Sequence, residues 1–349
     1  MGNGKGAVSK PDDIVVTHSL IKSFRRCPRI TLYKHHDGLA PRALSKPLKR
    51  GTWMHELLEA YYLGEDWKAV HRTNTERFSN LFDEEKDQLG DLPTEIMRLF
   101  KSYLWHYHND EDWTVHEVEF KLEATLPGGQ LWQGKSDMLI ENDEGLWIVD
   151  HKTHMVLPSL TQRLLDQQSI LYLWAARENN IPVLGFIWNY IRTKGPRPVR
   201  TTKLGTIAKN MGQTDYPTAY LSLAQQFGKE GLSPYKPYLR GLQKQRYVSG
   251  EMQLSPFFQR HTLVKDEGMI QRALEEASHT ADRYVDYDFE DRDSVERVPD
   301  RSCDWCSYKN LCTTELIGGN TNNVVRQEFM KQDPFHYYKG QNDDPLGGE

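Results

Sequence analysis

Only four cysteines occur among the 349 residues of this sequence, and long apolar runs are absent. No stretch approaches the ~18 consecutive apolar residues that a membrane helix needs. Residues 1–16 also lack the apolar segment of an export signal. We therefore expect a cytoplasmic protein without a membrane partner, in a reducing compartment where thiols bind metals more often than they form disulfides.

An excess of positive charge is also missing, since the formal net charge is −5. This balance alone argues against a nucleic-acid partner, but the charge is unevenly distributed. The segment 192–246 has eleven basic residues, only two acidic ones, and interleaved aromatic rings. Such a composition is typical of a surface that follows single-stranded DNA, although a solvated basic face has the same composition. The candidate DNA contacts are Arg240, Lys244 and Arg246.

The order of the sequence patterns predicts an α/β protein. Apolar spacing indicates helices before residue 112, alternation indicates three strands within 113–153, and a helix at 160–179 precedes a buried strand at 183–193. We expect six segments: a flexible lead (1–16), a helical region (17–112), a catalytic core (113–193), a basic aromatic insertion (194–260), a helix with a cysteine knuckle (261–316) and a disordered tail (317–349).

The cysteines are spaced as metal ligands often are. Cys303, Cys306 and Cys312 form a C-x2-C-x5-C pattern near the end of the chain, whereas Cys27 stands alone near its start. Four thiolates can hold a zinc ion or an iron–sulfur cluster. One metal centre that used all four would tie together segments about 275 residues apart. The alternative is four unrelated thiols.

A predicted hairpin places two carboxylates opposite one another. If residues 142–145 form the loop, Glu141 pairs with Leu146, and the same register pairs Asp137 with Asp150. Opposed side chains lie about 5 Å apart, where two carboxylates repel each other unless a cation lies between them. Lys152 projects to the same side of its strand as Asp150. A divalent ion held there could activate water, and Lys152 could orient that water.

Two further residues are candidate metal ligands. Glu119 lies on the preceding strand and could supply an additional oxygen, and His55 could supply a nitrogen from a helix. The alternative for Asp137, Asp150 and Lys152 is an exposed cross-strand cluster of ion pairs. His55 on its own has the simpler explanation of an ordinary core or surface histidine.

Taken together, these motifs resemble the PD-(D/E)XK nuclease superfamily. GKSD at 134–137 and D-x-K at 150–152 match its core motif, with Ser136 where the superfamily name has proline. G-x-x-x-H at 51–55, Q-x-x-x-Y at 168–172 and the division of the cysteines resemble the RecB-type branch with an iron–sulfur cluster. That branch includes AddB-type nucleases, CRISPR-associated Cas exonucleases and exonuclease V.

The resemblance implies a restriction-endonuclease-like α/β fold, with a mixed central sheet flanked by helices and closed by the four-cysteine staple. His55, Asp137 and Asp150 would bind Mg²⁺ or Mn²⁺, and Lys152 would be the catalytic lysine. Gln168 and Tyr172 would help to place the DNA. A [4Fe–4S] cluster, or alternatively Zn²⁺, would be held by Cys27, Cys303, Cys306 and Cys312.

The predicted function is that of a metal-dependent DNA exonuclease that acts on single-stranded ends. The resemblance implies a place in recombination, repair or phage DNA metabolism, beside a recombinase or helicase and, for a phage protein, in the host cytoplasm. The main alternative is an inert DNA-binding clamp of the same fold. Intact Asp137, Asp150 and Lys152 argue against that alternative.

Overall fold

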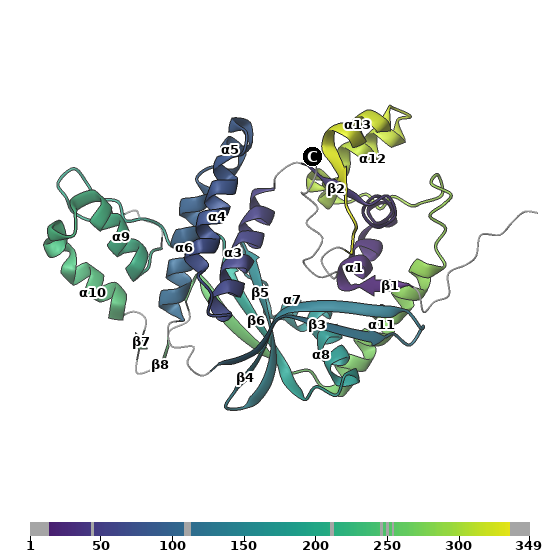
Figure 1. Ribbon diagram of the computed structural model, residues 1–349, viewed down its shortest axis with the longest axis horizontal. Helices are drawn as coiled ribbons and strands as arrows, with labels where there is room; N and C mark the ends of the chain where they lie inside the picture. Colours follow the sequence, from purple (N-terminus) through teal and green to yellow (C-terminus); the bar gives the residue numbers. More distant parts are fainter. Residues whose placement is uncertain are drawn as a thin grey trace, which may run out of the picture.

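The computed structural model describes residues 14–42, 45–107, 113–209, 213–244, 247–248, 251–252 and 255–335. A mixed β-sheet lies at its centre, and Figure 1 shows a group of helices rising from the sheet, with a smaller lobe on either side. Within the described ranges no helix has both the length and the apolar character to cross a membrane.

Six strands form the central sheet, in the order β1-β4-β5-β6-β9, with β3 paired to β4. β3–β4–β5 is an antiparallel meander, β5 and β6 run parallel, and β9 is antiparallel to β6. The bounds are Val15–Thr17 (β1), Thr114–Thr125 (β3), Leu131–Asn142 (β4), Gly145–His154 (β5), Val183–Arg192 (β6) and Phe258–Leu263 (β9). The predicted α/β class and the strands predicted within 113–193 are confirmed.

β4 changes its partner along one edge, and this change opens the sheet. Residues 131–133 pair with β1, whereas residues 138–142 pair with β5. In the described structure neither strand pairs with the intervening residues 134–137 on this edge. The opening lies where the sequence has its GKSD motif.

Helices cover both faces of the sheet. One apolar core joins α1, α8 and α11 to the sheet, and a second core joins α3 and α6 to β6 and β9. Asp166 caps the start of α8, so the helix predicted at 160–179 is divided into α7 and α8. The bounds are His18–Arg26 (α1), Lys46–Tyr62 (α3), Trp67–Ser79 (α4), Asp83–Leu89 (α5), Leu92–His106 (α6), Leu160–Leu164 (α7), Gln167–Glu178 (α8) and Glu267–Val285 (α11).

The two ends of the described chain pack against each other (Figure 1). Residues 317–349 were expected to be disordered, but residues 321–331 form α13 and β10, and β10 pairs with β2. Phe329 is buried in the apolar core of this lobe, which explains the order of the segment. The lobe consists of Pro28–Thr31 (α2), Leu32–His36 (η2), Leu39–Pro41 (β2), Arg301–Trp305 (η5), Lys309–Leu316 (α12), Thr321–Glu328 (α13) and Phe329–Lys331 (β10).

The basic segment forms the other lobe, with a small apolar core of its own. Leu223, Leu232 and Leu239 are buried there, so much of the segment that was expected to be an irregular insertion is helical. Residues 258–260 begin β9 and belong to the central sheet. The bounds are Tyr216–Phe227 (α9), Glu230–Tyr235 (η4), Lys236–Lys244 (α10), Tyr247–Val248 (β7) and Glu251–Met252 (β8).

Candidate active site

The register predicted for the hairpin is observed. Met138 pairs with Val149 and Glu141 with Leu146, on either side of a tight turn that Gly145 completes with a φ of +136°. The described pairing ends at Met138–Val149, one step before Asp137 and Asp150. Both aspartates are buried, so the hairpin delivers two carboxylates to the opening in the sheet.

Asp137 is held by two donors in the opening. His55 Nδ1 lies 3.0 Å from Asp137 Oδ1, and the backbone N–H of His151 donates to Asp137 Oδ2. Burial opposes ionisation, but the nearby His55 charge and hydrogen bond hold the pKa of Asp137 well below its usual range. Despite burial, Asp137 also raises the pKa of His55. The predicted meeting of His55 with Asp137 is therefore observed.

Asp150 has a different environment. It forms an ion pair with Lys152, and Gln168 Nε2 lies 3.5 Å from Asp150 Oδ1. Burial and the charge of Asp137 raise the pKa of Asp150 to about 6, against the opposing effect of Lys152. Although burial acts against it, Asp150 raises the pKa of Lys152, so this lysine stays protonated at neutral pH. The structure thus brings together the predicted Asp150, Lys152 and Gln168.

Tyr172 contacts the protein's own strand. Its hydroxyl accepts from the backbone N–H of Lys135 at 2.8 Å and donates to the carbonyl of the same residue at 2.6 Å. These bonds satisfy β4 in the region where neither β1 nor β5 pairs with it. Gly134 leaves room for the ring, because a Cβ there would lie 2.7 Å from Tyr172 Cε1. The buried Tyr172 therefore supports the opening, and the expected contact with DNA is not supported by its burial.

Gly51, the first residue of the G-x-x-x-H motif, lets α3 approach the sheet closely. A Cβ at this position would lie 3.3 Å from Thr153 Oγ1 on β5. His55 lies one helical turn further along α3, on the side of Asp137. Gly51 of the motif therefore serves packing between α3 and β5, whereas His55 contacts the candidate active site.

Glu119 is placed beside a lysine. The pairs Val118–Met138 and Phe120–Ser136 leave Glu119 opposite Asp137, with a φ of +57° that breaks the regular strand. Its carboxylate forms an ion pair with Lys135. Glu119 therefore lies next to the opening, and its role as a further metal ligand stays a prediction.

His151 is the main residue of the site that sequence reasoning missed. It is buried, Asn189 Nδ2 lies 2.7 Å from its Nδ1, and its ring stacks on Tyr62 at 5.8 Å. Burial lowers the pKa of His151 to about 3, so the ring is neutral. Asn189 also contacts Tyr103 Oη at 2.7 Å. Asn189 interrupts the largely apolar sequence of β6 with a polar amide. This interruption was the available sequence signal for a buried polar contact at this point.

The donors present suit a hard divalent cation. Two buried carboxylates, one of them with a raised pKa, indicate a deficit of positive charge that Mg²⁺ or Mn²⁺ would relieve. No three His, Cys, Asp or Glu side chains within the described ranges are grouped closely enough to hold an ion as they stand. Asp137 and Asp150 are thus the candidate ligands, and His55 stays a predicted third.

The four cysteines do not form the expected metal site in the part of the chain that the structure describes. All four thiols are free, and Cys303 is exposed. Their segments are neighbours nevertheless, since Arg26, next to Cys27, bonds to Ser302, next to Cys303, and Cys306 and Cys312 pack against one apolar core. The staple is therefore not part of the described fold, although the topology brings its proposed members to one region.

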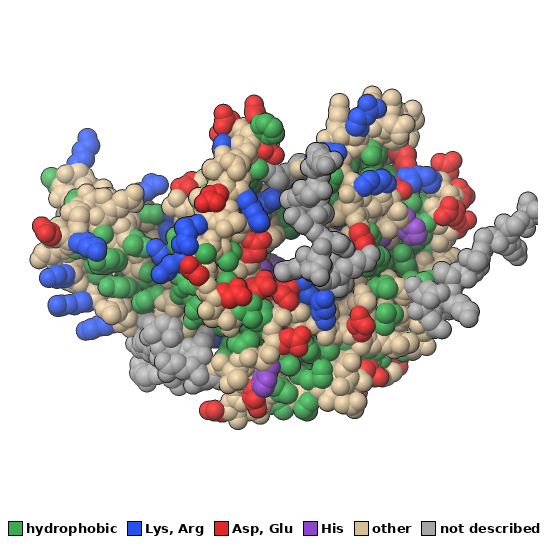
Figure 2. Space-filling model, viewed as in Figure 1, with side chains coloured by type: hydrophobic (Ala, Val, Ile, Leu, Met, Phe, Trp, Pro, Cys, Tyr) green, Lys and Arg blue, Asp and Glu red, His purple; other side chains and the backbone are tan. Residues whose placement is uncertain are grey.

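The candidate DNA contacts lie on the basic lobe. Lys236, Arg240 and Lys244 are exposed and follow at four-residue intervals along α10, which places them on one face of that helix. Figure 2 shows lysine and arginine side chains gathered over this lobe. Arg246 lies outside the described residues.

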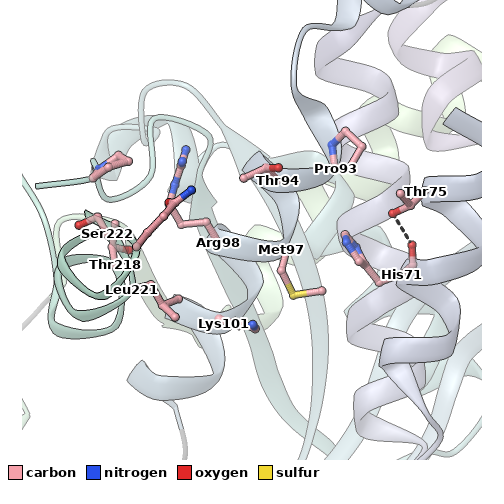
Figure 3. Close-up of a pocket in the computed structure, with 12 residues that line it drawn as sticks. His71, Thr75, Pro93, Thr94, Met97, Arg98, Lys101, Thr218, Leu221 and Ser222 are labelled. Carbon is pink, nitrogen blue, oxygen red and sulfur yellow. Dashed lines mark hydrogen bonds between the residues drawn. The ribbon is translucent and has the colours of Figure 1, made fainter. Parts of the chain in front are cut away.

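Two clefts lie in different parts of the molecule. One, of about 370 Å³, is enclosed by α4, α6 and α9, and its lining includes His71, Arg98 and Lys101 (Figure 3). It contains none of the candidate catalytic residues. The other, of about 760 Å³, adjoins the site directly, since Lys152 and Gln168 are part of its lining. Substrate for the carboxylate site would therefore occupy the second cleft.

Comparison with known proteins agrees with this geometry. The family model described as "PD-(D/E)XK nuclease superfamily" matches residues 15–313. No curated protein matches the chain. Among solved structures, a "Putative exonuclease" from Eubacterium rectale is 13% identical, with a TM-score of 0.42 over 87% of this chain and 98% of that one. The structure of SSO0001 is 16% identical, with a TM-score of 0.24 over 52% of this chain and 63% of that one.

Proposed function

Because the chain belongs to the PD-(D/E)XK nuclease superfamily, we propose that it hydrolyses DNA phosphodiesters at the opening between β4 and β5. The observation that carries this proposal is the group formed by the buried Asp137 and Asp150 with the partly exposed Lys152, assembled where the two strands separate. We further propose that the enzyme acts as an exonuclease on single-stranded ends.

Each residue has a distinct part in this proposal. Asp137 and Asp150, with His55 as a third ligand, would hold Mg²⁺ or Mn²⁺, which supplies an acidified water and charge neutralisation when bound. Lys152 stays protonated and can place positive charge beside the phosphate that is cleaved. Gln168 steadies Asp150, whereas the backbone N–H of His151 orients Asp137.

Variants of the carboxylates test the proposal. Asp150→Asn keeps the size of the side chain but removes a metal ligand, so cleavage of end-labelled single-stranded DNA should fall by at least about 100-fold. Linear and circular strands, single and double, would be compared in Mg²⁺ and in Mn²⁺. Cleavage by Asp150→Asn within about tenfold of the unmodified protein would overturn the assignment, whereas cleavage of circles would overturn only the exonuclease.

An inert clamp of the same fold is the second candidate. It would bind DNA without cleaving it in either metal. The protonated Lys152 paired with the buried Asp150 favours the enzyme, because a clamp has no need of a buried carboxylate pair with a lysine placed beside it.

The metal centre of the cysteines is a separate proposal. The contact between Arg26 and Ser302, the residues next to Cys27 and Cys303, supports it, although the ligands would have to draw closer than they lie here. Anaerobic purification followed by iron, sulfide and zinc analysis would distinguish a [4Fe–4S] cluster from Zn²⁺. Protein free of all three elements would show that the thiols are unrelated.

A further inference from the structure

The cleft beside Lys152 has two walls of different chemistry. One wall is the polar face of α1, where His18, Lys22 and Arg26 follow at four-residue intervals. The opposite face of α1 carries Leu20 and Ile21, which are buried in the core. The helical repeat of about 3.6 residues therefore places Lys22 and Arg26 on the face of α1 that lines the cleft.

The cationic wall has charge available for an anion. Lys22 is exposed and has no ion-pair partner among the residues that the structure describes. Arg26 bonds to Ser302 through neutral oxygens, at 2.8 Å to Oγ, and has no direct ion pair within the described ranges, although the Asp300 carboxylate accepts from the same Ser302 hydroxyl. Lys34 lines the same cleft and bonds to Ser19 Oγ at 2.8 Å. Asp166 is the acidic residue of the lining, and its carboxylate is engaged by the backbone N–H of Ser169 at the start of α8.

Another wall of the cleft is apolar. Val156, Leu157 and Pro158 follow the catalytic strand β5 and line the cleft. Val156 is 71% exposed and its neighbour Met155 is 58% exposed, so this wall presents unpartnered apolar surface. Trp188 and Tyr190 form part of the same lining.

We propose that this cleft binds one strand of DNA, with its phosphates along Lys22 and Arg26 and its bases against Val156, Leu157 and Pro158. This inference rests on the proposed nuclease function and names the residues that would hold its single-stranded substrate. A single strand has a charged edge and exposed base faces, which match the two walls. A duplex hides its base faces and carries phosphates on both flanks, so it matches neither the apolar wall nor the one-sided charge.

Binding measured in EDTA tests the cleft apart from cleavage. The probes are a fluorescein-labelled single strand, an abasic strand of the same length and a duplex. Lys22→Ala should weaken binding of both strands about threefold or more and reduce the slope of log K against log salt by about 0.7. Val156→Ser should weaken binding of the base-bearing strand by a similar factor and leave the abasic strand unaffected. The duplex should bind more weakly than the single strand.

Exposed matched residues outside the cleft provide the controls. Lys121→Ala and Val298→Ser make the same chemical changes at positions that do not line it, and both should bind as the unmodified protein does. The proposal is overturned if Lys22→Ala retains the full salt slope, if Val156→Ser affects both strands alike, or if the duplex binds as tightly. Asp150-dependent cleavage without these effects would refute the cleft alone, whereas the effects without any cleavage would refute the nuclease.

Discussion

At the scale of single residues, burial and neighbouring charges together set the ionisation of the side chains in the candidate active site. Asp137 is ionised because His55 and a backbone N–H stabilise its charge, whereas Asp150 shares its surroundings with a second carboxylate. Lys152 offsets part of that repulsion in the absence of a metal. Two aspartates of one motif therefore titrate differently, and the difference has a measurable consequence.

Metal affinity should depend on pH through Asp150. Its raised pKa of about 6 means that the folded protein holds this proton more tightly than the unfolded chain does. That contribution to stability is present below pH ~4 and is lost as the pH rises through 6. A metal must displace the proton, so the affinity for Mn²⁺ should fall about tenfold for each pH unit below 6. Calorimetric titration from pH 5 to 8 measures this, and a flat profile would contradict it.

At the scale of elements, β4 determines where the site can form. Among the described residues, its edge toward β1 and β5 has no strand partner at residues 134–137, and Tyr172 from α8 supplies hydrogen bonds there instead. The helix thus holds open a sheet that would otherwise tend to close. The fit depends on the absence of a side chain at Gly134.

Gly134→Ala should damage the site more than its size suggests. The added methyl would overlap the rings of Trp132 and Tyr172, which are both buried, and should cost about 1–3 kcal/mol of stability together with much of the activity. Gly241→Ala in α10 is the control, because no atom lies within 4 Å of its new Cβ. That variant should be stabilised by about 0.5–1 kcal/mol. Chemical denaturation measures the free energy of unfolding of both variants. Equal values would show that the rings of Trp132 and Tyr172 can move aside to accommodate the methyl group.

The exposed basic residues Lys236, Arg240 and Lys244 on α10 should contribute to DNA binding away from the candidate active site. Replacing Arg240 and Lys244 by alanine should weaken binding and lower the salt slope by about 0.7–0.9 for each lost phosphate contact. Fluorescence anisotropy over a range of salt concentrations measures the slope. Unchanged affinity at every salt concentration would mean that these basic residues only keep the surface of the lobe solvated. The cleft beside α1 would then be the remaining candidate for DNA binding.

At the scale of the whole molecule, an ionic hub joins the two ends of the chain. Glu315 on α12 contacts Arg29 at 3.0 Å, Tyr33 Oη at 2.6 Å and Arg297 at 2.8 Å. Arg29 is only 2% exposed, and it also donates to the carbonyl of Val295. These contacts close the terminal lobe without any metal ion.

Glu315→Gln should therefore unfold the terminal lobe more readily. The variant leaves the buried Arg29 guanidinium without a counter-charge, which costs about 3–5 kcal/mol. Glu290→Gln is a matched control at an exposed position and should change stability by less than about 0.5 kcal/mol. Thermal unfolding of metal-free protein measures both. A small effect of Glu315→Gln would leave the cysteines as the main candidate for joining the ends.

The sequence by itself determined the class of the fold, most of its elements and the carboxylate–lysine group at the opening in the sheet. Strand alternation and a short turn determine which residues oppose each other, which is why the register of Asp137 and Asp150 followed from residue numbers alone. Local spacing similarly indicated His55 on α3, whereas Gln168 on α8 was predicted from the Q-x-x-x-Y motif that resembles the family. These features depend on residues that are close together in the sequence, so the sequence pattern predicts them well.

Only the tertiary structure decided how those residues work together. The change of partner along β4, the bonds from Tyr172 to Lys135 and the burial of His151 all depend on elements that are distant in the sequence. The cleft lined by Lys22 and Val156 likewise requires α1 and the segment after β5 to lie beside the same space. The order of residues 321–331 depends on the pairing of β10 with β2. Composition made that segment look unstructured, because the apolar surface that it covers belongs to the other end of the chain.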